Sequence, residues 1–355
     1  MQNNKITVLI VDDSALIRQM LTSMLNSDPA IEVVGAAADP LIARQMIKQL
    51  NPDVLTLDIE MPKMDGIAFL EKIMSLRPMP VVMISSLTQQ GADVAIRALE
   101  IGAVDYIGKP TSDVKAGLED KTAEVIRKVK IAAKAKVFAK RAPTSGASTN
   151  IAYSAYKTTE QVIIIGASTG GVEALREIIT ALPANSPAVL VTQHMPGSFT
   201  TSFSKRLDSL SKVTVVEASD NQRVLPGHVY IAPGGLHLEL ARSGANYICA
   251  IQDEAPVSGH KPSVDVLMTS AAKVARDNAI GVILTGMGRD GAEGMLAMRN
   301  AGAYTVGQDE ASSIVYGMPK AAFELGAVEK QYPLKNITTA IFNSLEKQDM
   351  KAIRI

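Results

Sequence analysis

Residues 162–175, VIIIGASTGGVEAL, pass from a β-branched apolar run through a glycine-rich turn into a stretch with helical spacing. The turn fits Gly-x-Ser-x-Gly, with Ser168 at its centre. Such a strand–turn–helix unit exposes a serine hydroxyl beside helix N-terminal amides, which can stabilise an oxyanion. A phosphate or dinucleotide loop is the competing interpretation, because helix N-termini also bind anions. The stretch lacks the G-x-G-x-x-G spacing and the lysine of a P-loop, so it favours a nucleophilic serine in an α/β fold.

The residues around this unit predict an α/β domain. Strand signals occur at 162–165, 188–192, 213–216, 229–232, 236–240, 247–251, 280–284 and 304–306. Helical spacing occurs at 171–181, 198–210, 263–276 and 291–301. Pro226-Gly227 and Pro233-Gly234 punctuate the middle of the region, as hairpin loops do. We therefore expect a doubly wound, mostly parallel α/β sheet with a hairpin-rich insertion.

The first half of the chain also alternates strand and helix signals. Apolar runs predict strands at 6–11, 32–36, 54–57, 81–84 and 104–107. Helical spacing predicts helices at 15–25, 41–50, 67–76 and 92–100. Five short strands that alternate with helices indicate a parallel sheet with helices on both faces.

A change of composition separates the two halves. Residues 121–140 predict a last helix with an apolar stripe and many lysines, and a solvated basic face explains these lysines better than nucleic-acid contact. Residues 141–150, RAPTSGASTN, are small and polar, as in a linker. We expect a first domain at 1–125, a helical extension and flexible linker at 126–158, and a second domain at 159–350.

Length and composition limit the class of protein. The chain has 355 residues, which at about 150 residues per domain gives roughly two domains. Its 36 Lys and Arg balance 36 Asp and Glu, which disfavours a nucleic-acid-coating protein. Cys249 is the single cysteine, so no intrachain disulfide and no cysteine-rich zinc site is possible. No apolar run approaches the roughly 18 residues of a membrane span, and no signal peptide is evident, so we expect a soluble cytoplasmic protein without membrane insertion.

Charged and hydroxyl side chains follow the predicted strands of the first half. Asp12 and Asp13 end the first strand, Asp58 the third and Ser85 the fourth, and Lys109 follows the fifth. Because carboxyl ends of parallel strands meet at one edge, these side chains are predicted to share a crevice. Mg²⁺ held by the three carboxylates would offset their repulsion. The set predicts a phosphoryl acceptor, with Asp58 as nucleophile and Lys109 and Ser85 on the phosphoryl oxygens. Helix capping is the alternative for Asp13.

A nucleophilic serine needs a base, and the chain contains four histidines. His194 follows the strand after the Ser168 unit, so we expect it beside Ser168 at the sheet edge. His260, in a predicted loop, is the second candidate. His228 precedes a strand and His237 lies inside one, which is typical of structural or surface histidines. No clustered ligand spacing suggests zinc.

The base needs a partner that orients it. Asp290 falls just beyond the predicted strand at 280–284, within GMGRDG. A helix N-cap is the alternative role for this residue. The chain order Ser168, His194, Asp290 differs from the Ser, Asp, His order of the α/β-hydrolases, although the triad chemistry can be the same.

Residues 5–125 resemble the response-regulator receiver domains. The resemblance rests on VDDS, LDIEMPKMDG and YIGKP. It implies a flavodoxin-like (βα)₅ fold and an Mg²⁺-dependent phosphorylation of Asp58. It also implies that Tyr106 is the aromatic switch residue, that Ser85 stands where many receivers have Thr, and that the Lys109-Pro110 peptide is cis.

Residues from about 160 to 350 resemble the catalytic domain of the protein-glutamate methylesterases of bacterial chemotaxis. The motifs are IGASTGG, TQHMP and LTGMGRDGAEG. The resemblance implies a phosphorylation-activated methylesterase and glutamine deamidase that needs no cofactor for ester hydrolysis. It implies Ser168 as nucleophile, His194 as general base and Asp290 as its partner. Thr169 and Met287 would lie at the active site, with the Met287 amide in the oxyanion hole.

The same resemblance implies partners. Methyl-accepting chemoreceptors would be the substrates and a chemotaxis histidine kinase the phosphodonor, without nucleic acid. Two other classes remain open. A DNA-binding output domain would require a basic helix-turn-helix, which the second half lacks. A non-catalytic scaffold would be expected to have lost a triad residue.

Overall fold

The computed structural model describes residues 5–61, 65–85, 88–109, 118–137 and 161–353. The chain divides into two compact units, Met1–Thr144 and Ser145–Ile355. Most of the predicted linker lies outside the described residues. No described helix has the length and the apolar composition that crossing a membrane requires.

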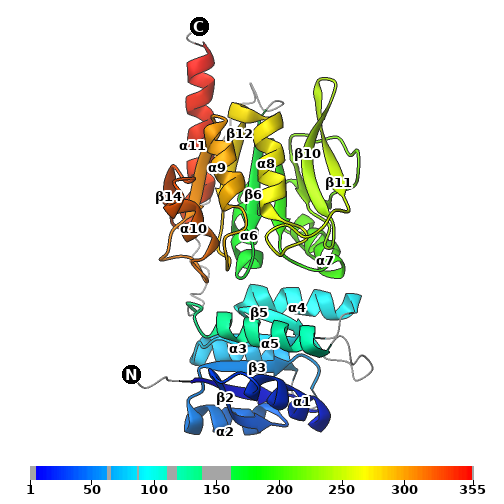
Figure 1. Ribbon diagram of the computed structural model, residues 1–355, viewed down its shortest axis with the longest axis vertical. Coiled ribbons are helices and arrows are strands. Elements are labelled where there is room, and N and C mark those ends of the chain that lie inside the picture. Colours follow the sequence, from blue (N-terminus) through cyan, green and yellow to red (C-terminus); the bar gives the residue numbers. More distant parts are fainter. Residues whose placement is uncertain (1–4, 62–64, 86–87, 110–117, 138–160, 354–355) are drawn as a thin grey trace. The chain divides into compact units, whose positions relative to one another are not determined.

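The first unit is a five-stranded parallel sheet in the order β2-β1-β3-β4-β5 (Figure 1). Its strands are β1 (Ile6–Val11), β2 (Ile31–Ala37), β3 (Val54–Asp58), β4 (Val81–Ser85) and β5 (Asp105–Gly108). Its helices are α1 (Ala15–Asn26), α2 (Pro40–Leu50), α3 (Gly66–Leu76), α4 (Gln89–Ile101) and α5 (Leu118–Ala132). This strand order is the flavodoxin-like order, so the predicted fold of the first half is confirmed.

Burial explains why the strands were visible in the sequence. Every residue of β3 and of β4 is buried, as expected of short apolar runs covered by helices on both faces. The turn after β1 leads into α1, which Ser14 caps by accepting a hydrogen bond from the Ile17 amide at 3.4 Å. Asp13 is exposed and is not the cap.

Helix α5 differs from the prediction at its C-terminus. It ends at Ala132 rather than at residue 140. Beyond Ala132 the backbone tightens, with the amides of Lys134 and Ala135 bonding three residues back. The basic residues of the helix are partly engaged within the unit, since Lys128 pairs with Asp105 at 3.2 Å. This pairing agrees with a structural rather than a nucleic-acid-binding face.

The second unit is a seven-stranded parallel sheet in the order β14-β13-β12-β6-β7-β9-β8. The strands are β6 (Val162–Ala167), β7 (Ala188–Gln193), β8 (Thr214–Glu217), β9 (His228–Ile231), β12 (Ala279–Ile283), β13 (Tyr304–Gln308) and β14 (Lys330–Tyr332). A separate antiparallel hairpin joins β10 (His237–Ser243) to β11 (Asn246–Gln252). The predicted doubly wound fold is therefore confirmed, and the expected insertion contains this hairpin.

The helices of the second unit are α6 (Gly171–Thr180), α7 (Gly197–Asp208), α8 (Val264–Val274), α9 (Ala292–Asn300), α10 (Met318–Glu324) and α11 (Leu334–Ile353), with a short 3₁₀ turn at Arg276–Asn278. No helix or strand was predicted beyond residue 306, so α10, β14 and α11 were missed. In Figure 1, α8 and α9 lie across the face of β6 and β12. Side chains from both helices enter one apolar core, which also includes Leu238 and Leu240 of the hairpin.

Close packing of α8 on β6 requires a glycine in the strand. A Cβ added at Gly166 would lie 2.2 Å from Cγ1 of Val264, in the first turn of α8. Such a separation is far below van der Waals contact. Gly166 therefore lets the N-terminus of α8 approach the end of β6, where the turn carrying Ser168 begins.

The direction of winding reverses at β6. β7 lies on one side of β6, and β12, which comes much later in the chain, lies on the other. Ligands of open α/β sheets bind beyond the carboxyl ends of strands at such a switch point. The turns after β6, β7 and β12 therefore form the natural site of this unit.

Candidate active site

Ser168 lies in the turn between β6 and α6. Gly170 adopts φ 79°, in the left-handed region that favours glycine, and α6 begins at the next residue. The Ser168 amide donates to the carbonyl oxygen of Thr285 at 3.1 Å, and its own carbonyl accepts from Gly171 at 2.7 Å. The Thr285 hydroxyl donates to the Thr169 carbonyl oxygen at 3.0 Å. The serine turn is thus fixed against the segment that follows β12.

His194 follows β7 and lies beside the serine turn. Its amide donates to the carbonyl oxygen of Ala167 at 3.2 Å. Its Nδ1 lies 3.1 Å from Oγ of Ser168, and its Nε2 lies 2.7 Å from Oδ2 of Asp290. Three neighbouring strands therefore bring together the three residues that the sequence predicted as a triad.

Asp290 lies beneath the imidazole, with 1% of its side chain exposed. It does not cap α9, whose N-cap is Gly291. It lies instead at the N-terminus of α8, where it accepts from the Ser263 hydroxyl at 2.7 Å and from the Val264 amide at 2.8 Å. The N-terminal end of a helix favours a negative charge, so the start of α8 stabilises this carboxylate.

Opposing effects set the protonation of the carboxylate. Burial by itself would raise the pKa of Asp290, but hydrogen bonding to His194 and its charge, aided by Ser263 and Val264, lower the pKa to about 2. Asp290 is then an ionised acceptor at neutral pH. Its partner Nε2 must carry the ring proton, which leaves Nδ1 to accept the proton of Ser168. The neighbouring Asp265 behaves oppositely, since burial and the charge of Asp290 raise its pKa.

Met287 follows Gly286, which lies close to Ser168. A Cβ added at Gly286 would lie 2.8 Å from Cβ of Ser168. Met287 is 44% exposed, and Gly288 behind it has φ 88°. Thr169 adjoins Ser168 in the chain, and Met287 adjoins Gly286, which packs against the serine; their roles stay predictions.

The other histidines occupy different environments. His260 stacks on the ring of His194, with 3.7 Å between ring centroids. His237 is buried, where Nδ1 accepts from the Ser263 amide at 3.1 Å and Nε2 donates to the Ala255 carbonyl at 3.1 Å. Nδ1 of His228 donates to the Pro226 carbonyl at 3.0 Å.

Two residues that contact the triad were not singled out from the sequence. Ser263 donates to Asp290, and Gln193 donates through Nε2 to the carbonyl oxygen of Ser168 at 2.9 Å. Gln193 precedes His194 in TQHMP, and Ser263 stands at the start of a predicted helix. These positions, one inside a motif and one at a predicted helix start, were the available signal, but neither partner could be identified without the fold.

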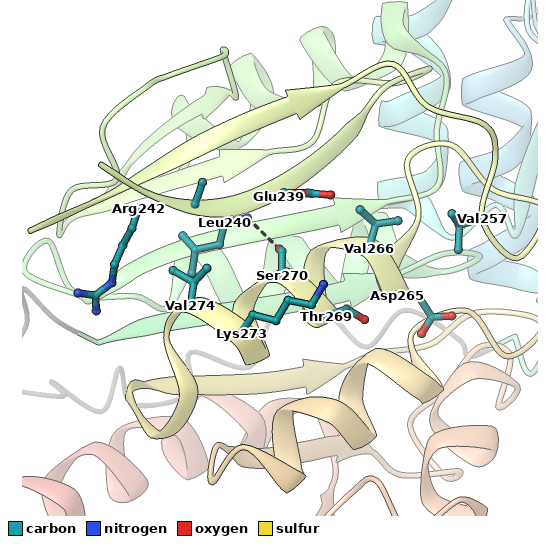
Figure 2. Close-up of a pocket in the computed structure, with 11 residues that line it drawn as sticks. Glu239, Leu240, Arg242, Val257, Asp265, Val266, Thr269, Ser270, Lys273 and Val274 are labelled. Carbon is teal, nitrogen blue, oxygen red and sulfur yellow. Dashed lines mark hydrogen bonds between the residues drawn. The ribbon is translucent and has the colours of Figure 1, made fainter. Parts of the chain in front are cut away.

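A cavity of about 430 Å³ lies between β10 and α8, and Figure 2 shows the side chains that line it. Its lining includes two cations, Arg242 and Lys273, and two acids, Glu239 and Asp265. These charges balance, so they favour neither an anionic nor a cationic ligand. The triad residues do not line it, and the chemistry of the site lies elsewhere in the unit.

The first unit brings its three predicted metal ligands together. One carboxylate oxygen from each of Asp12, Asp13 and Asp58 lies within 4.8 Å of the others. Asp12 and Asp58 are buried, and Oδ2 of Asp12 has no hydrogen-bond partner. A buried carboxylate oxygen without a donor suits a hard cation, so these residues fit Mg²⁺.

Lys109 lies against the same carboxylates. Its Nζ is 2.9 Å from Oδ1 and from Oδ2 of Asp58. Burial raises the pKa of Asp58 to about 6, although the hydrogen bond from Lys109 opposes this. Burial also raises the pKa of Asp12. Three clustered carboxylates face this one lysine, so the pocket holds more negative charge than Lys109 offsets when they are ionised, which again favours a bound cation.

Ser85 and Tyr106 lie near the same sheet edge. The Ser85 hydroxyl donates to the Gly91 carbonyl at 3.0 Å, and the Ser85 carbonyl accepts from the Lys109 amide at 2.8 Å. Tyr106 is buried, and Nζ of Lys128 lies 4.5 Å from its ring centroid. The predicted cis peptide at Lys109-Pro110 lies outside the described residues.

Comparisons with known proteins agree for both units. The model of the CheB methylesterase family matches residues 163–341, and that of the response regulator receiver domain matches residues 8–116. A protein-glutamate methylesterase/protein-glutamine glutaminase 1 of Geobacter metallireducens is 53% identical over 363 residues, covering 100% of both chains. The protein-glutamate methylesterase/protein-glutamine glutaminase of Bordetella parapertussis is 56% identical over 342 residues, covering 96% of this chain and 97% of its own. The crystal structure of the Thermotoga maritima CheB methylesterase catalytic domain is 38% identical with a TM-score of 0.51, covering 52% of this chain and 97% of that one.

Proposed function

This chain belongs to the family of CheB methylesterases that carry a receiver domain, and on this premise we propose that Ser168, His194 and Asp290 perform its reaction. The chain is a protein-glutamate methylesterase and protein-glutamine glutaminase of chemotaxis adaptation. The assignment of residues rests on one observation: His194 lies 3.1 Å from Oγ of Ser168 and 2.7 Å from Asp290. Because all three residues are present and hydrogen-bonded, a non-catalytic scaffold is disfavoured.

The substrate in this proposal is a γ-glutamyl methyl ester on the helical signalling region of a chemoreceptor. Oγ of Ser168 attacks the ester carbonyl carbon while Nδ1 of His194 takes the hydroxyl proton. Asp290 holds the tautomer that leaves Nδ1 free to accept, and it stabilises the imidazolium that results. The tetrahedral intermediate collapses, methoxide takes the proton from Nδ1, and methanol leaves an acyl-serine.

Hydrolysis of the acyl-serine completes the cycle. Water attacks the acyl carbonyl as Nδ1 takes one of its protons, and Ser168 recovers that proton when glutamate is released. Deamidation follows the same route, with the glutamine amide nitrogen leaving as ammonia. No metal or organic cofactor enters either reaction in this proposal.

The developing negative charge requires donors beside Ser168. We assign this part to the Met287 amide and to Thr169. An oxyanion hole of amides beside a helix N-terminus is a strong source of transition-state stabilisation. The Gly171 amide is already engaged by the Ser168 carbonyl, so it contributes little to the oxyanion.

The receiver is assigned to residues 1–125, with the extension and linker at 126–158 and the catalytic domain at 159–350. Residues 126–132 complete α5, which packs within the first unit. Asp12, Asp13 and Asp58 would hold Mg²⁺, which neutralises phosphoryl oxygens during transfer. Asp58 would take a phosphoryl group from a chemotaxis histidine kinase.

Around the phosphoryl group, Lys109 and Ser85 would bind its oxygens and Tyr106 would follow the movement of Ser85. In this proposal phosphorylation of Asp58 activates the esterase. We also propose a cytoplasmic location, without nucleic-acid partners, because the kinase and the receptor signalling regions would be met there.

The decisive test measures methanol release from methylated receptor membranes by the full chain and by Ser168→Ala, each with and without a small-molecule phosphodonor. Release by the full chain that is lost in folded Ser168→Ala supports the proposal. Undiminished release by the variant would assign the nucleophile elsewhere. If the full chain released no methanol under any condition, the non-catalytic scaffold would be favoured.

A further inference from the structure

The ring of His260 lies flat against the ring of His194. Their centroids are 3.7 Å apart and their planes differ by 8°. Resting on the proposed function, we propose that His260 is a positioning residue, which fixes the tilt of the base imidazole by stacking and takes no proton from Ser168.

Two hydrogen bonds leave one motion of the imidazole weakly restrained. His194 is held at Nδ1 by Ser168 and at Nε2 by Asp290. These bonds act in the ring plane, but they resist only weakly a small rotation about the Cβ–Cγ bond, which tips both nitrogens out of that plane. Hydrogen bonds weaken steeply as their angle opens, so tilt degrades proton transfer before either contact is lost. A flat ring against one face opposes that tilt directly.

A tight turn places His260. The amides and carbonyls of Val257 and His260 bond reciprocally, at 3.1 Å and 2.9 Å. Ser258 and Gly259 between them adopt φ values of 53° and 78°. Two left-handed central residues are the mark of a type I′ turn, which is a rigid two-residue connection. The position of the ring is therefore set by the backbone.

The same short segment also holds Asp290. The Ser258 hydroxyl donates to Oδ2 of Asp265 at 3.2 Å, which ties the turn to α8. The Lys261 carbonyl accepts from the Gly235 amide at 3.2 Å. Ser263 then donates to Asp290. Residues 257–265 therefore supply both the His260 ring that stacks on His194 and the hydrogen-bond donors that bind the Asp290 carboxylate.

Stacking separates His260 from the role of a second base. Imidazole nitrogens donate and accept in the plane of the ring. Two parallel rings therefore exchange no proton through their faces, while both nitrogens of His194 are already engaged. The stack requires only a flat ring at position 260. Phenylalanine should therefore be able to take the place of histidine there, and leucine should not.

The test compares His260→Phe with His260→Leu in the full-length chain, with His228→Leu as a control for a histidine remote from the triad. His260→Leu should lower kcat by about tenfold or more, since small misplacements of a catalytic group are costly. KM should stay near the wild-type value, because His260 positions the base and does not bind substrate. His260→Phe should restore most of kcat.

A spectroscopic measurement makes the test independent of turnover. With isotope-labelled histidine, the His194 ring proton should carry a ring-current shift that persists in His260→Phe and disappears in His260→Leu. Equal loss of kcat in both variants would overturn stacking in favour of a role for the His260 nitrogens, and wild-type kcat in both would overturn any positioning role.

These outcomes can be told apart from failure of the proposed function. If the full chain released no methanol, the proposed function would fail, whereas the ring-current shift would still report the stack. If His260→Leu did not fold, the shift and kcat of His260→Phe would decide alone: retention of both supports stacking, and loss of either rejects it.

Discussion

Nδ1 of His194, rather than Nε2, faces Oγ of Ser168, at 3.1 Å. In the chymotrypsin template the serine meets Nε2 and the aspartate meets Nδ1. Here both assignments are reversed. His194 follows β7, the strand beside β6, and Asp290, which follows β12, meets Nε2 with a carboxylate that also accepts from the first turn of α8. The same proton relay is available, with the tautomer set by Asp290.

Replacing Ser168 by alanine should lower methanol release by roughly 10⁴-fold or more, as for other serine nucleophiles. The fold should survive, because the main-chain bonds of Ser168 to Thr285 and Gly171 do not involve the hydroxyl. Thermal unfolding of the variant checks this. Ser209→Ala, at an exposed hydroxyl after α7, is the matched control and should be unaffected.

Among the other triad changes, His194→Ala should lower methanol release severely, and Asp290→Asn should lower it somewhat less. The asparagine can still accept some of the helix donors, but it can no longer enforce the tautomer with Nε2 protonated. Steady-state methanol release by folded variants ranks them. If His260→Ala were the more damaging histidine change, His194 would not be the base.

The depressed pKa of Asp290 predicts a pH dependence of stability. Its folded pKa of about 2 lies below the ordinary aspartate pKa of 3.8, so the carboxylate stabilises the fold above pH 4. The contribution is about 2 kcal/mol and is lost as the pH falls from about 4 to about 2. Denaturant unfolding of the second unit should show Asp290→Asn destabilised at pH 7, by an amount that shrinks on acidification. A difference independent of pH would contradict this.

Asp58→Asn should abolish formation of the acyl phosphate with a small phosphodonor and Mg²⁺. Asp13→Asn should instead weaken Mg²⁺ binding, because Asp13 contributes one of the three clustered oxygens without being the nucleophile. Phosphate incorporation and an Mg²⁺ titration separate the two effects. Undiminished labelling of Asp58→Asn would refute the site unless Asp13 or Ser85 were shown to replace it.

The sheets were predictable because their strands are buried on both faces, so that runs such as Val162–Ile165 stand out as apolar. The end of α5 was not, since alanine and lysine continue past Ala132 with helical spacing although little apolar surface remains to be buried. β14 has only three residues, none of them buried, and carries almost no pattern.

Within the candidate site, the sequence predicted that each residue lies at a strand end, but it did not predict which residues each one contacts. His194 and Asp290 follow strands, so the common edge was predictable. The stack of His260 depends on the two-residue turn at Ser258 and Gly259, and the bond from Ser263 depends on how α8 packs on β6. Both arise from tertiary packing, which no local pattern records.

Removing the receiver should raise the unstimulated activity. A short linker would hold the two units at an effective concentration of roughly 1 mM, so a receiver with even a weak affinity for the surface around Ser168 would cover it most of the time. The fragment from Tyr153 onward should therefore release methanol faster than the unphosphorylated full chain. Assays at matched substrate concentration test this directly.

Phosphorylation should then activate the full chain and leave that fragment unchanged. Charge added at Asp58 would draw Ser85 and Tyr106 toward the phosphoryl group and so alter the surface near β4 and β5. If the receiver covers Ser168 through that surface, a contact worth a few kcal/mol would be weakened by such a change. Asp58→Asn in the full chain is the control, and it should stay at the unstimulated rate with phosphodonor present. If the fragment were no faster than the unphosphorylated chain, covering of Ser168 by the receiver would be rejected. Activation would then have to come from the phosphorylated receiver itself, through receptor docking or direct stimulation of the esterase.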